Sequence, residues 1–234
     1  MPESLLPGAP APGIRVIDLT QPLSAVTPMW PGNAPPVMTA EAELAADGFF
    51  TRRFEMSEHT GTHLDAPAHF TAGGTAADAI PAERLVVPAV VVDAPGGPHA
   101  LLTAAAVREH EGLHGVVPAG CAVLVRTGWE RHLADPERYI GRMDFPGVAV
   151  DAAELLVSRG VVGVGIDTLG VDTGAATDFP VHARVTLPAG VWHLEGLVNL
   201  GALPPRGATL FVGVLPLAGG SGAPARVLAV LPGA

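Results

Sequence analysis

The apolar residues of this chain gather in short runs that glycine, proline and small polar residues separate. Valine, leucine and isoleucine dominate the runs, and each run is short enough to form a strand. Pro88 interrupts the valine run at 86–92, so we expect the regular buried strand only after it, at 90–93. The predicted strands therefore occupy residues 14–19, 37–44, 49–56, 90–93, 122–129, 161–167, 210–215 and 227–231.

Helical patterns are fewer than strand patterns. Residues 103–110 begin with Thr103, whose hydroxyl suits a helix N-cap. A second helix is predicted for 151–159, ended by Gly160, and a short third one for 80–85. Because strands outnumber helices and helices separate some of them, we expect one mixed α/β domain.

The start of the chain differs in composition from the rest. Residues 1–13 are rich in proline and alanine and lack the basic start and apolar centre of a signal peptide. We therefore expect a flexible arm at 1–13 and a single domain over 14–234. The single Cys121 excludes a disulfide within the chain and fits a reducing cytoplasm, and we expect it in the core.

Charge and composition narrow the class of partner. With 234 residues, 48% hydrophobic and 15% charged, the chain is expected to be globular with a substantial core. The net charge of −10 argues against nucleic acid and anionic membranes as partners. No apolar run reaches the length of a membrane span. Neither nucleic acid nor a membrane is therefore the expected partner.

A proline-rich segment at 22–36 contains too many prolines for a helix or a central strand. Trp30 lies within it and has two interpretations. Its side chain packs on the core as an anchor, or its indole forms one wall of a pocket for a planar aromatic ligand. The residues alone do not choose between the two.

The densest chemistry lies at 57–70, where one stretch holds four candidate metal ligands. An extended strand over the ten steps between the outer two would span about 33 Å, too far for one metal centre. Gly61 and Pro67 disfavour a helix, so we expect the chain to bend at these two residues. Imidazoles and a carboxylate brought together in this way suit zinc or manganese. The four candidates are His59, His63, Asp65 and His69.

The sequence His-Thr-Gly-Thr-His-Leu-Asp-Ala-Pro-Ala-His-Phe at 59–70 resembles the signature of the cyclase family, which includes bacterial kynurenine formamidases and isatin hydrolases. The resemblance implies that His59, His63 and Asp65 bind metal and that His69 is the catalytic acid/base. It also implies a mixed sheet or small barrel flanked by helices, of the swivelling β/β/α type. It extends over about 18–217.

Two tryptophans gain a role from this resemblance. The family carries a similar Trp-Pro-Gly segment whose tryptophan contacts substrate, which favours the pocket interpretation of Trp30. It also has a similar Arg-Thr-Gly-Trp, so Trp129 is expected to help shape the site. The family usually has aspartate at the position of Asn33, so this chain lacks that carboxylate.

Further ligands are implied late in the chain. By the resemblance, His182 takes a second metal ion and Glu195 bridges both ions. The family's Asn-Leu after the glutamate is Gly196-Leu197 here, so we expect the local turn to differ. His193 would share the face of Glu195 on a strand, and spacing alone does not exclude it as a ligand. We expect it instead to line the pocket or to support a ligand from behind.

These residues predict a metal-dependent hydrolase. The five ligands carry two negative charges against four positive charges on two ions, a surplus that would activate a bridging hydroxide for attack on a carbonyl carbon. His69 would pass the proton to the leaving nitrogen or oxygen. Zinc is the favoured metal and manganese the alternative. The substrate is expected to be small and aromatic, and the chain a homodimer, as family members tend to be.

The resemblance favours an arylformamidase-like enzyme that cleaves an N-formylkynurenine-like amide. An isatin (lactam) hydrolase or a lactone hydrolase is the alternative within the family. A non-catalytic member that binds a metal or a small ligand is an alternative of a different class, and it would tolerate the loss of His69. A purely structural zinc site is disfavoured, because such sites prefer cysteines. The remaining histidines are expected at the surface: His99, His110, His114 and His132.

Overall fold

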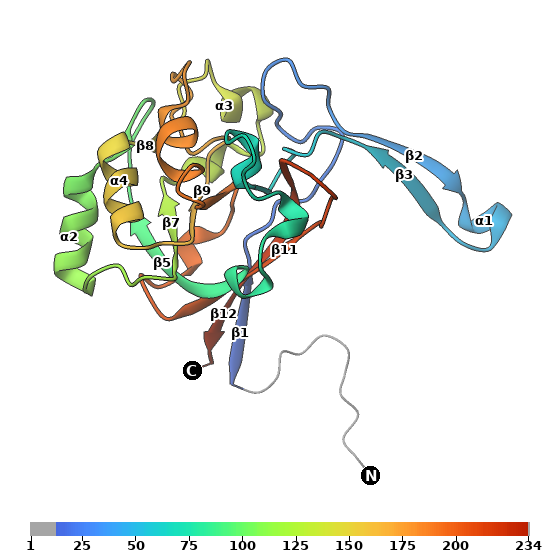
Figure 1. The fold of residues 1–234 in the computed structure, drawn as a ribbon. Helices are drawn as coiled ribbons and strands as arrows, with labels where there is room; N and C mark the ends of the chain where they lie inside the picture. The colour runs from blue at the N-terminus through green and yellow to red at the C-terminus, as the bar shows by residue number, and fades with distance from the viewer. Residues whose placement is uncertain (1–12, 234) are drawn as a thin grey trace, which may run out of the picture.

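An eight-stranded mixed sheet forms the centre of the computed structural model, which describes residues 13–233 (Figure 1). The predicted arm at 1–13 therefore lies, apart from Gly13, outside the described residues. In spatial order the strands are β1 (Ile14–Asp18), β12 (Gly222–Pro232), β11 (Ala208–Val214), β5 (Val86–Asp93), β7 (Ala122–Arg126), β9 (Gly163–Ile166), β10 (Trp192–Glu195) and β4 (His63–Asp65).

The sheet closes on itself because β4 pairs with two strands. It runs antiparallel to β10 on one edge and antiparallel to β12 on the other. In the middle of the sheet β5, β7, β9 and β10 run parallel. The structure thus agrees with the expected mixed α/β domain built on a small barrel.

The core lies on both sides of this sheet because side chains alternate along each strand. In β5, Val91 points to the inside of the barrel, whereas Val90 and Val92 point outward. The outer side is covered by α2 (Ala104–His114) and α4 (Val150–Ser158), which pack side by side (Figure 1). Both faces of the central strands are therefore buried, as their continuous apolar sequence predicts.

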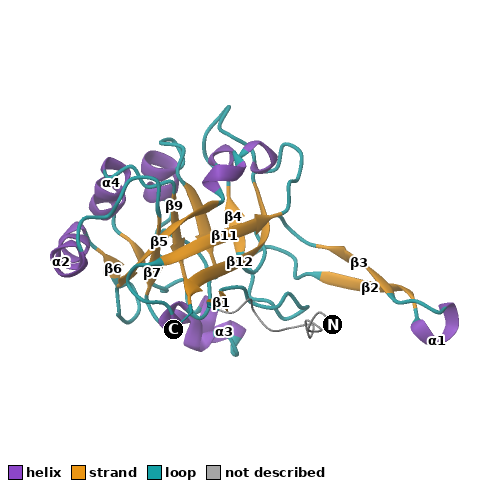
Figure 2. Cartoon of the chain, turned by 90° about the horizontal axis from the view of Figure 1, so that it is seen from below, coloured by secondary structure: helices purple, strands orange, loops and turns teal. Residues whose placement is uncertain are grey.

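A hairpin projects away from the body of the molecule (Figures 1 and 2). It consists of β2 (Val37–Ala42), the one-turn helix α1 (Leu44–Asp47) and β3 (Thr51–Glu55). Strand pairing sets Met38 opposite Phe54, and Phe54 is 59% exposed. The two predicted strands at 37–44 and 49–56 thus pair with each other and stay outside the main sheet.

Short elements complete the described chain. None of the described helices combines the length and the apolar character that a bilayer span needs. A small parallel pair is formed by β6 (Leu101–Leu102) and β8 (Gly147–Val148), and α3 spans Pro136–Ile140. A π-helix lies at His182–Thr186. The 3₁₀ turns lie at Pro67–His69, Ala77–Ala79, Ala82–Arg84, Trp129–His132 and Leu200–Ala202.

The expected break at Pro88 is wrong, since β5 runs without interruption from Val86 to Asp93. The neighbour β7 begins opposite Ala89, so the strand is still an edge on that side at Pro88. A proline is tolerated at an edge because no neighbouring strand requires its missing N–H. Thr103 caps α2 as predicted, accepting a hydrogen bond from the amide of Ala106.

Two of the four histidines expected at the surface are buried. His110 lies one turn after Val107 on the inner side of α2, which is one turn longer than predicted. His132 packs edge-on against Trp129, with ring centroids 4.9 Å apart. Both are placed by tertiary packing that their polar neighbours in the sequence do not reveal.

Candidate metal centre

The predicted bend at Gly61 and Pro67 is present. Gly61 has a φ of +63°. A Cβ at this position would clash with the side chain of Leu23, because it would lie only 2.5 Å from Leu23 Cδ2. Pro67 begins a 3₁₀ turn. As a result the rings of His59 and His69 stack with centroids 4.0 Å apart, although an extended chain would separate them by about 33 Å.

Strand register brings the early and late ligand candidates together. On the β4–β10 pair, His63 lies opposite Glu195 and Asp65 lies opposite His193. His63 Nε2 is 3.4 Å from Glu195 Oε2 and 3.2 Å from Asp65 Oδ1. All four residues are buried. A strand pairing across more than a hundred residues of sequence therefore builds the base of the site.

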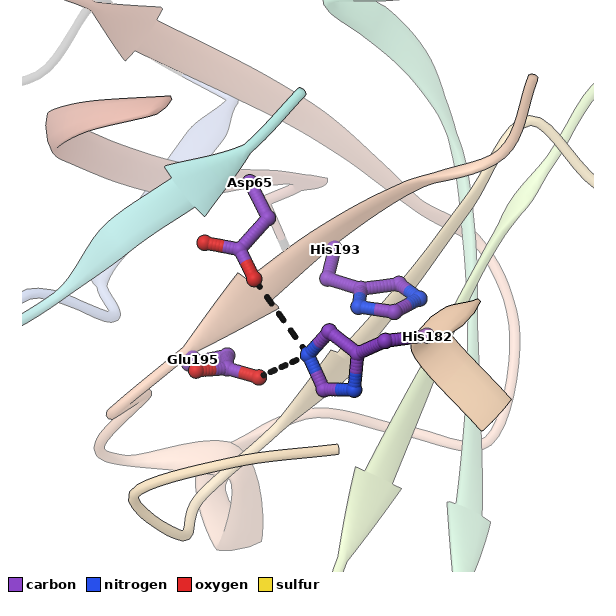
Figure 3. Close-up of side chains that lie close together, drawn as sticks. All are labelled: Asp65, His182, His193 and Glu195. Atoms are coloured by element: carbon purple, nitrogen blue, oxygen red, sulfur yellow. Dashed lines mark hydrogen bonds and ion pairs between the residues drawn. The ribbon is translucent and has the colours of Figure 1, made fainter. Parts of the chain in front are cut away.

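His182 enters the cluster from the π-helix at His182–Thr186 (Figure 3). Its Nε2 lies 3.1 Å from Glu195 Oε1 and 3.3 Å from Asp65 Oδ2. Its Nδ1 contacts Asp172 Oδ2 at 2.6 Å. Short π-helical segments often occur at functional sites, where they direct one side chain inward. Here the segment directs His182 at two carboxylates.

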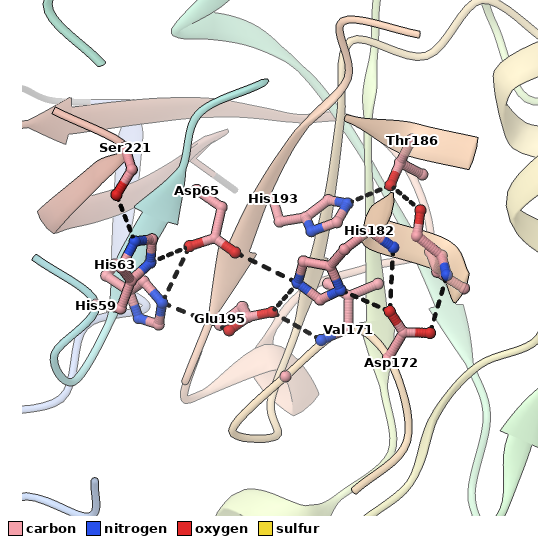
Figure 4. A network of polar contacts seen from close by, with 12 residues as sticks. His59, His63, Asp65, Val171, Asp172, His182, Thr186, His193, Glu195 and Ser221 are labelled. Carbon is pink, nitrogen blue, oxygen red and sulfur yellow. Dashed lines mark hydrogen bonds and ion pairs between the residues drawn. The ribbon is translucent and has the colours of Figure 1, made fainter. Parts of the chain in front are cut away.

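The two buried histidines are oriented by the nitrogen that faces away from the cluster. His63 Nδ1 donates to the carbonyl of Gly61 at 2.9 Å, because a carbonyl only accepts. The carboxylate of Asp172 accepts a hydrogen bond from His182 Nδ1 (Figure 4). It also accepts one from the backbone amide of Val181. Each ring thus presents Nε2 to the carboxylates, the arrangement in which a histidine binds metal.

The electrostatics of the cluster follow from two buried carboxylates side by side. Burial raises the pKa of Asp65, but hydrogen bonds from His182, His59 and His63 bring it well below its usual range. Burial and the charge of Asp65 raise the pKa of Glu195, and hydrogen bonds from His182 and His63 more than offset them. Both carboxylates are therefore ionised.

The same contacts hold positive charge on two rings. Burial lowers the pKa of His63, but hydrogen bonds to Asp65 and Glu195 raise it to about 10. Burial likewise opposes a charge on His182, and bonds to Asp172, Asp65 and Glu195 raise its pKa well above the usual value. The cluster is thus an anionic site that attracts cationic charge.

This donor set fits a divalent metal ion. One donor atom each from Asp65, His182, His193 and Glu195 lies within 4.8 Å of the others, and so does a second set from His59, Asp65 and His69. A cation would satisfy the ionised carboxylates in place of the protons on His63 and His182, since metal binding releases protons from its ligands. Imidazole and carboxylate are ligands that zinc and manganese accept.

His59 is linked to the C-terminal part of the chain. Its Nδ1 lies 2.6 Å from Asp65 Oδ1, and its Nε2 lies 2.9 Å from Ser221 Oγ (Figure 4). Ser221 in turn donates its hydroxyl to Glu58 at 2.6 Å. Residue 221 directly precedes β12, so closure of the sheet places this hydroxyl behind His59.

His193 is fully buried beside the cluster. Its ring meets that of His182 edge-on, with centroids 4.4 Å apart, and its Nε2 lies 2.6 Å from Thr186 Oγ1. Burial and the charge of His182 lower the pKa of His193 to about 3, so the ring is neutral. Its Nδ1 is buried and has no hydrogen-bond partner among the described residues.

A pocket of about 250 Å³ opens above the cluster, and aromatic rings form its walls. Trp30 packs against Phe179 at 5.6 Å between centroids, and Phe179 packs against Phe70 at 5.7 Å. His69 lies at the same rim and, with Phe70, is exposed to solvent. Asn33 also lines the pocket. The site thus combines an anionic base with walls suited to a flat ring.

Trp129 does not line this pocket. Its indole Nε1 donates to the carbonyl of Tyr139 at 2.8 Å, and the residue packs in a buried aromatic cluster with Tyr139 and Phe145. Phe145 contacts Trp30 edge-on at 6.2 Å. Trp129 therefore stands one layer behind the pocket wall.

Three polar residues near the cluster were not predicted as parts of the site: Asp172, Thr186 and Ser221. Asp172 accepts hydrogen bonds from the backbone amides of Val181 and His182. Its contact with the ring of His182 is the feature missed. A carboxylate ten residues before a proposed ligand is a weak signal, and a serine 162 residues from His59 gives none.

The chain resembles known proteins over nearly its whole length. A family model described as putative cyclase matches residues 17–173. Isatin hydrolase of Roseibium aggregatum is 32% identical over 244 residues, covering 94% of this chain and 92% of that protein. Kynurenine formamidase of Salinibacter ruber is 32% identical over 219 residues, covering 92% of this chain and 97% of that protein. The structure of isatin hydrolase A from Ralstonia solanacearum matches with a TM-score of 0.87 at 36% identity, covering 93% of this chain and 92% of that protein.

Proposed function

We propose that this chain, which belongs to the cyclase family, is a metal-dependent hydrolase that cleaves an amide C–N bond of a small aromatic substrate. The observation that carries the proposal is the buried cluster of Asp65, His182 and Glu195 at the base of an aromatic pocket. The names of the two curated relatives, one a lactam hydrolase and one a formamidase, support the amide bond as the target.

The proposed cofactor is a divalent metal, with two ions per chain. His59, His63 and Asp65 would hold one ion, and His182 would hold the other. Glu195 and Asp65 contact the histidines of both groups, so they are suited to bridge the ions. Zinc is favoured and manganese is the alternative, because both accept nitrogen and oxygen ligands.

The proposed mechanism assigns the protein's own residues as follows. When bound, the metal supplies Lewis-acid polarisation of the substrate carbonyl and lowers the pKa of water. Partial burial lowers the pKa of His69, so the ring is neutral and able to accept a proton near pH 7. His69 stands at the rim beside His59, where it can pass that proton to the leaving nitrogen. Trp30 and Phe179 hold the ring of the substrate.

The pocket favours a neutral substrate over an amino acid. Among the described residues, no arginine lines it, and the chain contains no lysine. N-formylkynurenine carries an ammonium and a carboxylate, and a carboxylate without a cationic partner binds poorly in a partly desolvated pocket. Asn33 stands where the family usually has aspartate, so this position supplies no negative charge for the ammonium. We therefore place a neutral bicyclic lactam such as isatin first and an arylformamide second.

The direct test is a comparison of two substrates. Protein loaded with zinc or with manganese is assayed on isatin and on N-formylkynurenine, with chelator-treated protein as control. We expect metal-dependent opening of isatin with kcat/KM above about 10⁴ M⁻¹s⁻¹. Faster cleavage of N-formylkynurenine would establish the formamidase instead. Protein that holds metal but cleaves neither compound would contradict both proposed substrates.

We further propose that the chain forms a homodimer in the cytoplasm. The hairpin supports this proposal because Met38 and Phe54 form an uncovered apolar patch on one of its faces. Arg53 pairs with Glu41 and Glu55 on one face, whereas Met38 and Phe54 lie together on the other. A two-stranded sheet is marginal alone and needs a surface to pack on.

The homodimer is tested by sedimentation of the wild type and two variants. Phe54→Glu places a charge on the apolar face, and Thr39→Glu places the same charge on the polar face of the same hairpin. We expect the wild type and Thr39→Glu to have about twice the chain mass of 23.8 kDa and Phe54→Glu to have the mass of one chain. A wild type of one chain mass at micromolar concentration would disprove the homodimer.

A further inference from the structure

The pairing of His193 with Thr186 determines which nitrogen of the imidazole carries the hydrogen. Thr186 Oγ1 has one hydrogen, and it donates this hydrogen to the carbonyl of Val181 at 2.8 Å. The same oxygen lies 2.6 Å from His193 Nε2, so at this contact it accepts. Nε2 therefore carries a hydrogen, and Nδ1, which has no hydrogen-bond acceptor among the described residues, presents a bare lone pair.

This lone pair has no hydrogen-bond donor among the described residues. Apart from Thr186, one donor atom each of Asp65, His182 and Glu195 lies within 4.8 Å of a ring nitrogen of His193 (Figure 3). Both carboxylates only accept when ionised, and both ring nitrogens of His182 face carboxylates, Nδ1 at 2.6 Å from Asp172 and Nε2 at 3.1 Å from Glu195. A fully buried acceptor without a donor is costly, so the arrangement calls for a cation among these groups.

The register of β4 and β10 places the ring of His193 beside Asp65, His182 and Glu195. His193 lies opposite Asp65 on the β4–β10 pair and two residues before Glu195, on the same face of β10. One donor atom of each lies within 4.8 Å of the others and of His182. On a strand, alternate residues share a face, so the backbone fixes this position independently of side-chain rotation.

We propose that His193 Nδ1 is a metal ligand that completes a four-ligand site with Asp65, His182 and Glu195. This inference rests on the metal centre proposed above and departs from the supporting role that the sequence suggests for His193. Two imidazoles and two carboxylates would fill all four positions of a tetrahedral ion. The ion at this site is then the tightly held one, and the ion at His59 and His63 keeps a position open for substrate.

Metal titration against a competing chelator tests the proposal. The wild type is compared with His193→Leu and with His132→Leu, a matched loss of a buried histidine that lies against Trp129, outside the cluster. We expect the wild type and His132→Leu to bind two zinc ions with unequal affinity. In His193→Leu we expect the affinity of the tighter ion to fall by more than about 100-fold, beyond the 10- to 100-fold effect of a residue that only supports a ligand. A smaller fall would mean that His193 supports a ligand and is not one itself.

Two results separate failure of this inference from failure of the proposed function. If His193→Leu binds both ions as the wild type does, His193 is not a ligand and the metal centre stands. If the wild type binds no ion, the metal centre itself fails. Should His193→Leu not fold, wild-type protein with isotope-labelled histidine is loaded with cadmium. One-bond coupling of the metal to His193 Nδ1 is the expected signal, and its absence overturns the proposal.

Discussion

His63 and Glu195 lie directly opposite each other across the β4–β10 pair, with His63 Nε2 3.4 Å from Glu195 Oε2. Both residues lie on paired strands and not on loops, so the backbone hydrogen bonds of the sheet fix their separation. Sites on strands hold their side chains more precisely than sites on loops. The position of the proposed bridging carboxylate is therefore as rigid as the sheet itself.

Glu195→Gln should weaken metal binding while the shape of the site is kept. The amide cannot supply the negative charge that now faces His63 and His182. We expect the affinity for metal to fall by at least about 100-fold, because loss of a direct ligand exceeds the 10- to 100-fold effect of its supporting residues. Metal content after dialysis measures this. Glu154→Gln, on the exposed side of α4, is the control and should retain the wild-type content.

His69→Ala should separate chemistry from metal binding. The ring lies at the rim of the pocket and stacks on His59, but it is not needed to hold Asp65 or Glu195 in place. We expect unchanged metal content and a kcat lower by about 10²- to 10⁴-fold. His114→Ala, an exposed histidine on α2, should leave kcat unchanged. Full turnover in His69→Ala would support a different proton carrier.

Asn33→Asp should shift the choice of substrate. Asn33 lines the pocket at an exposed position, where a carboxylate would meet the ammonium of an amino-acid substrate. An exposed ion pair contributes up to about 1 kcal/mol, so kcat/KM for N-formylkynurenine should rise up to about fivefold. The value for isatin, which has no charge to pair, should stay the same. Equal changes for both substrates would argue against this placement of the amino-acid group.

The Glu111–Arg159 pair predicts a pH dependence of stability. Arg159 donates to both carboxylate oxygens of Glu111 at 2.8 Å and ties α2 to the end of α4. This hydrogen bonding lowers the pKa of Glu111 from 4.5 to about 2. The stabilisation is therefore fully present above pH 4.5 and is lost as the pH falls towards about 2.

Thermal unfolding of the wild type and Glu111→Gln checks this pair. The wild type should have the higher Tm at neutral pH, and the difference should shrink below pH 4.5. Glu109→Gln, an exposed change on the same helix, should give no pH-dependent difference. A difference that persists at the lowest pH would mean that the pair acts through packing and not through charge.

Local rules of the backbone made the bend in the metal segment predictable. Glycine permits the left-handed conformation that Gly61 adopts, and proline fixes its own φ, so the sequence shows where the chain turns. The approach of His59 to His69 follows from these two turns. The late ligand candidates are different, because the family resemblance and not the spacing directed attention to His182 and Glu195.

Contacts between distant segments were not predictable in the same way. Nothing near Ser221 in the sequence indicates His59, and nothing near Thr186 reveals that its hydroxyl fixes the hydrogen of His193. The same holds for Pro88, whose place in a strand depends on where β7 begins. Each of these facts is a property of the assembled sheet. One sequence read along its length carries only the local part of such information.

The double pairing of β4 also has a consequence for folding. Its partners β10 and β12 are synthesised more than a hundred residues after it. Pairings so distant in sequence form slowly, because a long loop must close before any contact is gained. On the ribosome, His63 and Asp65 therefore emerge long before the strands that will cover them. The cluster of Asp65, His182, His193 and Glu195 is therefore incomplete in a nascent chain until β10 has left the ribosome.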